Sequence, residues 1–124
     1  MDAHIALVEN DLPTNRALAR LLRISGYTVA PFPSAEQFLD CLAAGLPACL
    51  IADVDLDGMS GVELQALLRQ RHPDLPVIVI TGRSDPEAQA RAEALGCSSF
   101  LHKPVGARDL LDAIVLAIAG RRPH

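Results

Sequence analysis

Apolar and polar positions alternate in blocks along the chain. Short apolar runs bounded by turn-forming or charged residues predict buried β-strands at residues 4–8, 27–30, 49–52, 76–80 and 97–101. Between them, apolar side chains recur every three or four positions, which predicts helices at residues 11–26, 34–45, 60–72, 84–96 and 106–119. This alternation predicts an α/β fold with a parallel sheet, right-handed crossovers and helices on both faces.

The helices differ in the signals that support them. Ser34 followed by Gln37, and Ser60 followed by Glu63, have the spacing of a capping box at a helix start. The helix at 84–96 is rich in alanine and has a thin apolar stripe, so we expect it to be held less firmly than the others. The last helix has a broad apolar face directed at the core, formed by Leu110, Leu111, Ile114, Val115 and Ile118.

Polar side chains follow the predicted strands at the point where each strand ends. They are Glu9, Asn10, Asp11, Asp53, Asp55, Thr81 and Lys103. Because parallel strands bring their carboxyl ends to one edge of a sheet, we expect these residues to form one rim. Clustered carboxylates suit a hard divalent cation such as magnesium, and a carboxylate can act as a nucleophile toward phosphorus. Thr81 and Lys103 are then suited to bind phosphoryl oxygens.

Length, charge and cysteine content limit the number of domains, the kinds of partner and the cellular location that we expect. The 124 residues are expected to form one domain, residues 1–124, and the formal net charge of −4 argues against direct nucleic-acid binding. No apolar run reaches membrane-spanning length and the first residues do not resemble a signal peptide, so we expect a cytoplasmic protein without a membrane partner. The three cysteines, Cys41, Cys49 and Cys97, have no disulfide or zinc spacing and are expected to be buried small hydrophobes.

Taken together, the motifs resemble the receiver domain of two-component response regulators. The matching segments are residues 8–11, residues 53–61, Thr81 with Gly82, and Lys103 with Pro104, in the family's order and spacing. The resemblance covers the chain from Ile5 to Ala119 and implies a flavodoxin-like (βα)5 fold with strand order 2-1-3-4-5. It also implies a cis bond between Lys103 and Pro104.

The resemblance implies roles for individual residues. Asp53 would accept a phosphoryl group from a histidine kinase or phosphotransfer protein, Thr81 and Lys103 would bind that group, and Thr81 and Phe100 would form the switch. Mg²⁺, or Mn²⁺ in its place, would be held by Glu9, Asn10, Asp53 and the backbone carbonyl of Asp55. The only enzymatic activity implied is self-catalysed phosphoryl transfer and hydrolysis.

Two departures from the family pattern change these expectations. The usual pair of acids at the end of the first strand is Glu9-Asn10 here, which predicts weaker magnesium binding unless Asp55 or Asp11 compensates. Residues 56–58 read Leu-Asp-Gly where the family commonly has Met-Pro followed by a polar residue, which alters loop stiffness. We also predict that Arg83 pairs with Asp55 across the site and lengthens the phosphoryl lifetime.

Phosphorylation would shift the surface formed by the fourth helix, the fifth strand and the fifth helix, for a downstream partner, an output domain or a homodimer. The alternative is a receiver-like interaction module that works without phosphorylation and has a weakened metal site at Asn10. A flavodoxin-like cofactor enzyme is a third class. It is disfavoured because the loop after the first strand contains residues 12–15, Leu-Pro-Thr-Asn, and no glycine-rich phosphate loop.

Overall fold

The computed structural model describes residues 4–120, so the expected unit of residues 1–124 extends past both ends of the described range. Five strands are present: β1 (His4–Val8), β2 (Thr28–Phe32), β3 (Cys49–Asp53), β4 (Val77–Thr81) and β5 (Ser99–His102). The helices are α1 (Leu12–Ile24), α2 (Ala35–Cys41), the short 3-10 helix η1 (Leu42–Ala44), α3 (Gly61–Arg71), α4 (Pro86–Ala94) and α5 (Ala107–Ala119).

All five strands are parallel, and the sheet order is β2-β1-β3-β4-β5. The predicted fold class and strand order are therefore confirmed. The register pairs Val8 with Ala52, Asp53 with Ile80, and Thr81 with His102. This register brings the ends of β1, β3, β4 and β5 level at one edge of the sheet, where the predicted rim lies.

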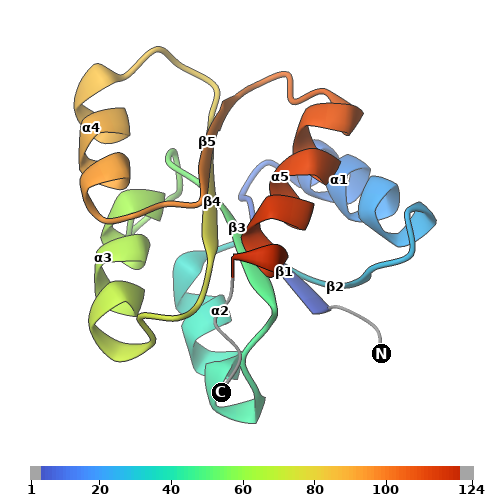
Figure 1. Ribbon diagram of the computed structural model, residues 1–124, viewed down its shortest axis with the longest axis horizontal. Helices are drawn as coiled ribbons and strands as arrows, with labels where there is room; N and C mark the ends of the chain where they lie inside the picture. Colours follow the sequence, from blue (N-terminus) through green and yellow to red (C-terminus); the bar gives the residue numbers. More distant parts are fainter. Residues whose placement is uncertain (1–3, 121–124) are drawn as a thin grey trace.

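The sheet has an apolar core on each face. Ile5, Leu7, Ile51, Ile78 and Ile80 pack under α1 and α5, whereas Ala6, Val8, Leu50, Ala52 and Val79 pack under α2, α3 and α4. Figure 1 shows α1 and α5 on one side of the strands and α3 and α4 on the other. Because successive strand residues face opposite sides, strands covered on both faces must be apolar throughout, as β3 and β4 are up to their final residue.

The helix starts follow the cap signals. Asp11, Ser34 and Asp85 each accept a backbone hydrogen bond from the residue three positions later, at the first turns of α1, α2 and α4. Ser60 and Glu63 form the complete capping box predicted for α3. At Ser34 the structure gives only the serine half of the predicted box, and the neighbouring Glu36 carboxylate instead contacts a different segment of the chain.

Several predicted boundaries and environments were wrong. The second strand begins at Thr28 and continues to Phe32, because Tyr27 N–H closes the end of α1 on Leu22 and Pro31 is tolerated in an edge strand. The strand predicted at 76–80 lies one residue later, and the strand predicted at 97–101 begins two residues later and ends one residue later. The second helix ends at Cys41, with η1 leading to Gly45.

The side chains of Val115 and Cys41 were predicted to be buried, but both face solvent. Val115 is 58% exposed, since it lies next to Leu116, which is 66% exposed on the outer side of α5. Cys41 is exposed at the end of α2, whereas Cys49 is buried and Cys97 half-buried. The expectation that all three cysteines are core residues therefore holds fully for Cys49 alone.

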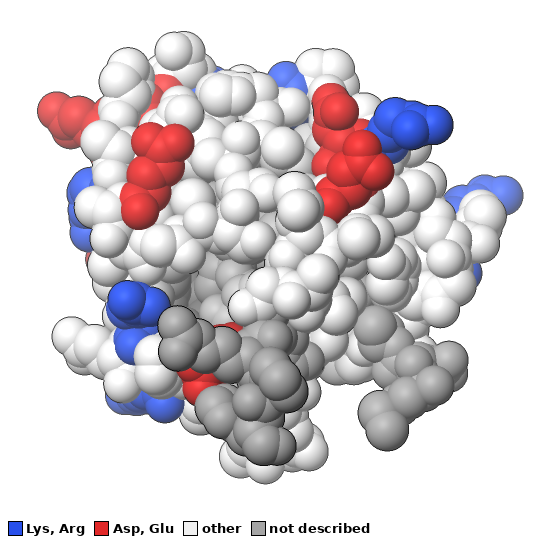
Figure 2. Space-filling model, viewed as in Figure 1, with Lys and Arg blue, Asp and Glu red and all other residues white. Residues whose placement is uncertain are grey.

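Two further observations concern the apolar character of the helices and the charged side chains at the surface. Among residues 4–120, no helix combines the length and apolar character needed to cross a bilayer. On the face shown in Figure 2, the basic side chains of the described residues lie in separate groups on a mostly uncharged surface.

Candidate functional site

The ammonium group of Lys103 lies between two carboxylates at the end of the sheet. Its Nζ donates to Asp53 Oδ2 at 2.6 Å and to Glu9 Oε1. The two acids are almost fully buried, and the side chain of Lys103 is 23% exposed. Residues that follow or end β1, β3 and β5 thus converge on one charged group, as the strand ends predicted.

The protonation of this group reflects burial and pairing. Burial raises the pKa of the Glu9 carboxyl, and the nearby Asp53 carboxylate acts in the same direction, while the hydrogen bond from Lys103 opposes both. Burial disfavours the charged form of Lys103, but its bonds to Asp53 and Glu9 outweigh that effect and raise the pKa of the amine. A cation is thereby held where two carboxylates would otherwise repel each other.

The residues after Glu9 have different surroundings. Asn10 is half-buried next to Glu9, and Asp11 is exposed, where its side chain caps α1 at Thr14. Hydrogen bonds from the side chain and backbone of Thr14 lower the pKa of Asp11. The sequence analysis missed Asn15, which is buried and donates Nδ2 to the carbonyls of Glu9 and Phe32, so that it fixes the backbone at the acid.

Thr81 lies at the end of β4 and is 1% exposed. Its Oγ1 accepts from Arg83 N–H at 3.3 Å and donates to the Arg83 carbonyl at 3.2 Å. The hydroxyl therefore bonds to the β4–α4 loop in this conformation. Thr81 and His102 are opposite each other in the β4–β5 register, immediately before Lys103, so the hydroxyl and the ammonium group lie on neighbouring strands.

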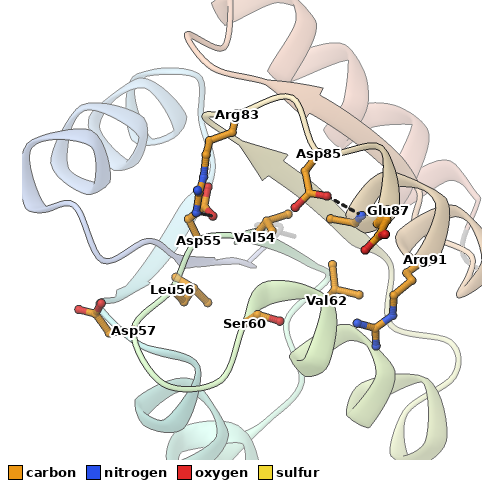
Figure 3. Close-up of a pocket in the computed structure, with 11 residues that line it drawn as sticks. Val54, Asp55, Leu56, Asp57, Ser60, Val62, Arg83, Asp85, Glu87 and Arg91 are labelled. Carbon is orange, nitrogen blue, oxygen red and sulfur yellow. Dashed lines mark hydrogen bonds and ion pairs between the residues drawn. The ribbon is translucent and has the colours of Figure 1, made fainter.

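The predicted pair between Arg83 and Asp55 is present. Arg83 donates to Asp55 Oδ1 at 2.8 Å, and this pairing raises the pKa of the guanidinium group. Figure 3 shows the two side chains side by side at the edge of an open pocket of about 490 Å³ between the β3–α3 loop and the start of α4. The side chain of Asp55 is 34% exposed, and that of Arg83 is 77% exposed.

The loop that follows Asp53 is restrained at several points by hydrogen bonds and close packing. Asp53 Oδ1 accepts from Asp55 N–H at 2.9 Å, and the start of α3 crosses so close to the strand that a Cβ on Gly61 would lie 2.1 Å from the Asp53 carbonyl oxygen. Near the end of the loop, Glu36 from α2 accepts from Met59 N–H at 3.2 Å. Glycine is required at position 61 because no side chain fits there.

Phe100 and the bond before Pro104 complete the predicted set. Phe100 is half-buried on β5, packs against the core under α3 and α4, and lies edge-on to His102 with ring centroids 5.5 Å apart. The Lys103–Pro104 peptide is cis, as predicted. The structure therefore joins Glu9, Asp53 and Lys103 directly and places Thr81 at the end of β4, next to the strand that carries Phe100.

The donor atoms at this edge fit a hard cation in kind. Glu9 and Asp53 supply carboxylate oxygens, and a buried pair of acids whose mutual repulsion is relieved by a cation is the electrostatic setting that a divalent ion requires. Among residues 4–120, no group of three or more His, Cys, Asp and Glu side chains is arranged to hold a metal. Further ligands would then be amide or backbone oxygens of the protein and water, which Mg²⁺ usually retains.

Known proteins share this sequence and fold. The family described as response regulator receiver domain matches residues 5–115. Nodulation protein W of Bradyrhizobium diazoefficiens is 37% identical over 115 residues, 93% of this chain and 51% of that protein. Response regulator protein FleR of Pseudomonas aeruginosa is 35% identical over 123 residues, 99% of this chain and 26% of that protein.

Among solved structures, the crystal structure of FixJ-N superposes with a TM-score of 0.91 at 30% identity, covering 100% of this chain and 99% of that one. The chain spans about half or less of the length of the two named relatives, 51% and 26%. The family match extends from β1 into α5 and includes Glu9, Asp53, Thr81 and Lys103. The chain therefore belongs to the response regulator receiver domain family.

Proposed function

We propose that the chain is a phosphoacceptor that receives a phosphoryl group on Asp53 from a histidine kinase or phosphotransfer protein in the cytoplasm. The observation that carries this proposal is the Lys103 ammonium group, which joins the buried carboxylates of Asp53 and Glu9 at the carboxyl end of the sheet. A buried nucleophilic carboxylate beside a fixed cation is suited to bond with an anionic phosphoryl group.

In this reaction a carboxylate oxygen of Asp53 attacks phosphorus, a P–O bond forms, and the P–N bond to the donor imidazole breaks. The released imidazole nitrogen retains the bonding pair and takes a proton from solvent. Lys103 and Thr81 bind the transferred oxygens, and hydrolysis later returns Asp53 to a carboxylate. Bound Mg²⁺, or Mn²⁺, would be held by Glu9, Asn10, Asp53 and the Asp55 carbonyl and would neutralise phosphoryl charge.

The response to phosphorylation follows from the bonds of Thr81. In the unphosphorylated structure its hydroxyl bonds to the backbone of Arg83. Turning toward a phosphoryl group breaks that contact, releases the β4–α4 loop and opens space for Phe100. The surface of α4, β5 and α5 then favours a downstream partner, an output domain or a second copy of the chain.

A surface for the phosphodonor lies beside Lys103. A mostly apolar cleft is lined by Pro13, Thr14, Ala17, Leu18, Pro104 and Val105, with Lys103 at its edge. A partner helix with an apolar face could dock there and present its phosphorylated side chain to Asp53.

The alternative is an interaction module that works without phosphorylation. The observation that favours it is Asn10, which replaces one of the two acids expected at the metal. If Asn10 abolishes metal binding, the exposed apolar side chains of α5, Val115 and Leu116, would still offer a contact surface.

The test is the intact mass of the protein after incubation with phosphoramidate or acetyl phosphate, with and without Mg²⁺, for wild type and Asp53→Ala. The proposal expects one phosphoryl adduct that requires Mg²⁺ and disappears in Asp53→Ala. If no adduct forms with any divalent ion, the interaction module is the correct reading, and Asn10→Asp is the first reversion to make.

A further inference from the structure

Glu36 is an exposed acid on α2 that neither the sequence analysis nor the proposed phosphoryl chemistry uses. It lies in the first turn of α2 but does not cap its own helix, since Ser34 accepts the bond from Gln37 N–H there. Its Oε2 instead accepts from Met59 N–H, 23 residues away, at 3.2 Å. The carboxylate thus links α2 to the later part of the β3–α3 loop.

The loop is shaped to receive this carboxylate. Gly58 has φ +76°, a conformation that side chains rarely adopt, and a Cβ built on it would lie 2.9 Å from Glu36 Oε2. Glycine at this position therefore serves two needs, the left-handed turn and the close approach of the acid. Met59, the next residue, is half-buried and packs against the core under α2 and α3.

Both ends of the loop are held by other hydrogen bonds. Its first residues are tied to Asp53 through Asp55 N–H, and its last residue is fixed by the capping box of Ser60. Asp57 is exposed, and positions 56–58 contain no proline to stiffen the backbone. In the described part of the chain, the segment between Leu56 and Ser60 is bonded to residues outside the loop through the hydrogen bond from Met59 N–H to Glu36.

We infer that Glu36 is a positioning residue for phosphoryl transfer: it holds the β3–α3 loop, whose Asp55 carbonyl is one of the oxygens that would hold the metal. This inference rests on the proposed function. Glu36 touches neither the acceptor nor the donor, and it acts through Met59 and Gly58 on the backbone that carries the ligand. Its charge also strengthens the bond to the amide beyond that of a neutral acceptor.

The test compares Glu36→Ala, Glu36→Gln and the control Asp40→Ala, which removes an equally exposed acid from the same helix. Three quantities are measured: hydrogen exchange of the Met59 amide by NMR, Mg²⁺ affinity by calorimetry, and the rate of phosphorylation by phosphoramidate. We expect Glu36→Ala to accelerate Met59 exchange and weaken Mg²⁺ binding about fivefold, with a matching loss of rate at subsaturating Mg²⁺.

The conservative variant separates positioning from general stability. Glu36→Gln keeps an oxygen that accepts from Met59, so it should stay within about twofold of wild type in Mg²⁺ affinity, and Asp40→Ala should match wild type. Faster Met59 exchange in Glu36→Ala with unchanged Mg²⁺ affinity overturns the inference, as does equal weakening in Asp40→Ala or a wild type that binds no Mg²⁺. If wild type binds Mg²⁺ but takes up no phosphoryl group, the proposed function fails, and the affinities still decide the role of Glu36.

Discussion

Helices α3 and α4 lie side by side on the same face of the sheet, yet they are held in opposite ways. Helix α3 buries Gly61, Val62, Leu64, Gln65 and Leu68, and its first turn is locked by a complete capping box. Helix α4 buries one residue, Ala92. Asp53, the proposed acceptor, thus precedes the firmly held helix, and Thr81, which would respond to phosphorylation in the proposed function, precedes the loosely held one.

The loops that lead to α3 and α4 differ in how much movement they tolerate. The loop leading to α3 has no free space at Gly61, so Asp53 and α3 move together. The loop leading to α4 is exposed from Gly82 to Glu87, and its bond to Thr81 uses one hydroxyl. A change at the acceptor can therefore move α4 while leaving the acceptor strand in place.

The largest effect is expected from one methyl group placed on each of the two loops. In Gly61→Ala, the new Cβ would lie 2.1 Å from the Asp53 carbonyl oxygen, so we expect a loss of about 3 kcal/mol or more in the free energy of unfolding. In Gly82→Ala the nearest atom is Lys103 Cδ at 3.7 Å, so the loss should stay below about 1 kcal/mol. Urea denaturation measures both. Equal losses would contradict the contrast between the loops.

The next effect concerns the tether between the two helices. Gln65 Nε2 donates to the Ala92 carbonyl at 2.9 Å, while Gln65 Oε1 is buried without a hydrogen-bond partner. Gln65→Leu removes the tether and the unsatisfied oxygen together, and the Ala92 carbonyl keeps its bond from Cys97 N–H. We expect global stability to change by less than about 1 kcal/mol, while amide exchange in α4 accelerates about tenfold.

Exchange measured by NMR at each amide distinguishes this outcome from general loosening. Amides of α3 should exchange as in wild type. A variant in which α3 and α4 accelerate to the same extent would show that the two helices open as one unit, and the comparison above would be wrong.

A smaller effect is expected where the two loops meet. Arg83→Ala removes the exposed bridge to Asp55, and exposed ion pairs contribute little, so loss of the phosphoryl group should accelerate about threefold at most. The matched control is Arg91→Ala, which removes the other arginine of the same pocket. Phosphoprotein decay is followed by intact mass. An unchanged rate in Arg83→Ala would remove the basis for the predicted effect of Arg83 on phosphoryl lifetime.

The smallest effect concerns the cap of the firm helix. Hydrogen bonds from Ser60 lower the pKa of Glu63 below its ordinary value of 4.5. A depressed carboxyl pKa stabilises the fold above the unfolded-state pKa, and this contribution disappears as pH falls through the folded-state pKa. Urea midpoints between pH 3 and pH 7 should therefore show Glu63→Gln slightly less stable than wild type near neutrality and equal to it in acid. A gap that persists in acid would contradict this assignment.

Much of the fold could be predicted from sequence because its signals are local. Buried strands, cap residues and helix stops lie within a few positions of each other, and the strand ends then place Glu9, Asp53, Thr81 and Lys103 without further information. The pairing of Arg83 with Asp55 followed from the same placement. The exposure of Val115 did not, because an apolar residue at the border of a helix face can point either way.

The contacts that the sequence analysis missed join residues far apart in the chain. Glu36 reaches Met59 across 23 residues, Gln65 reaches Ala92 across 27, and Asn15 reaches Phe32 across 17. In each contact a polar side chain bonds to a backbone group. Nearly every residue carries the same backbone groups, so the sequence does not indicate which of them will be the partner. Such contacts become visible only when the elements are in position.

Lys103 is the only lysine of the chain, and its amine lies at the centre of the acceptor site. A reagent that acylates amines therefore has one side-chain target here, apart from the terminal amine. Acylation requires the neutral amine, so the pairing that raises the pKa of Lys103 also shields it from such reagents. The mass gained on acylation would thus indicate whether Lys103 is paired with its two acids.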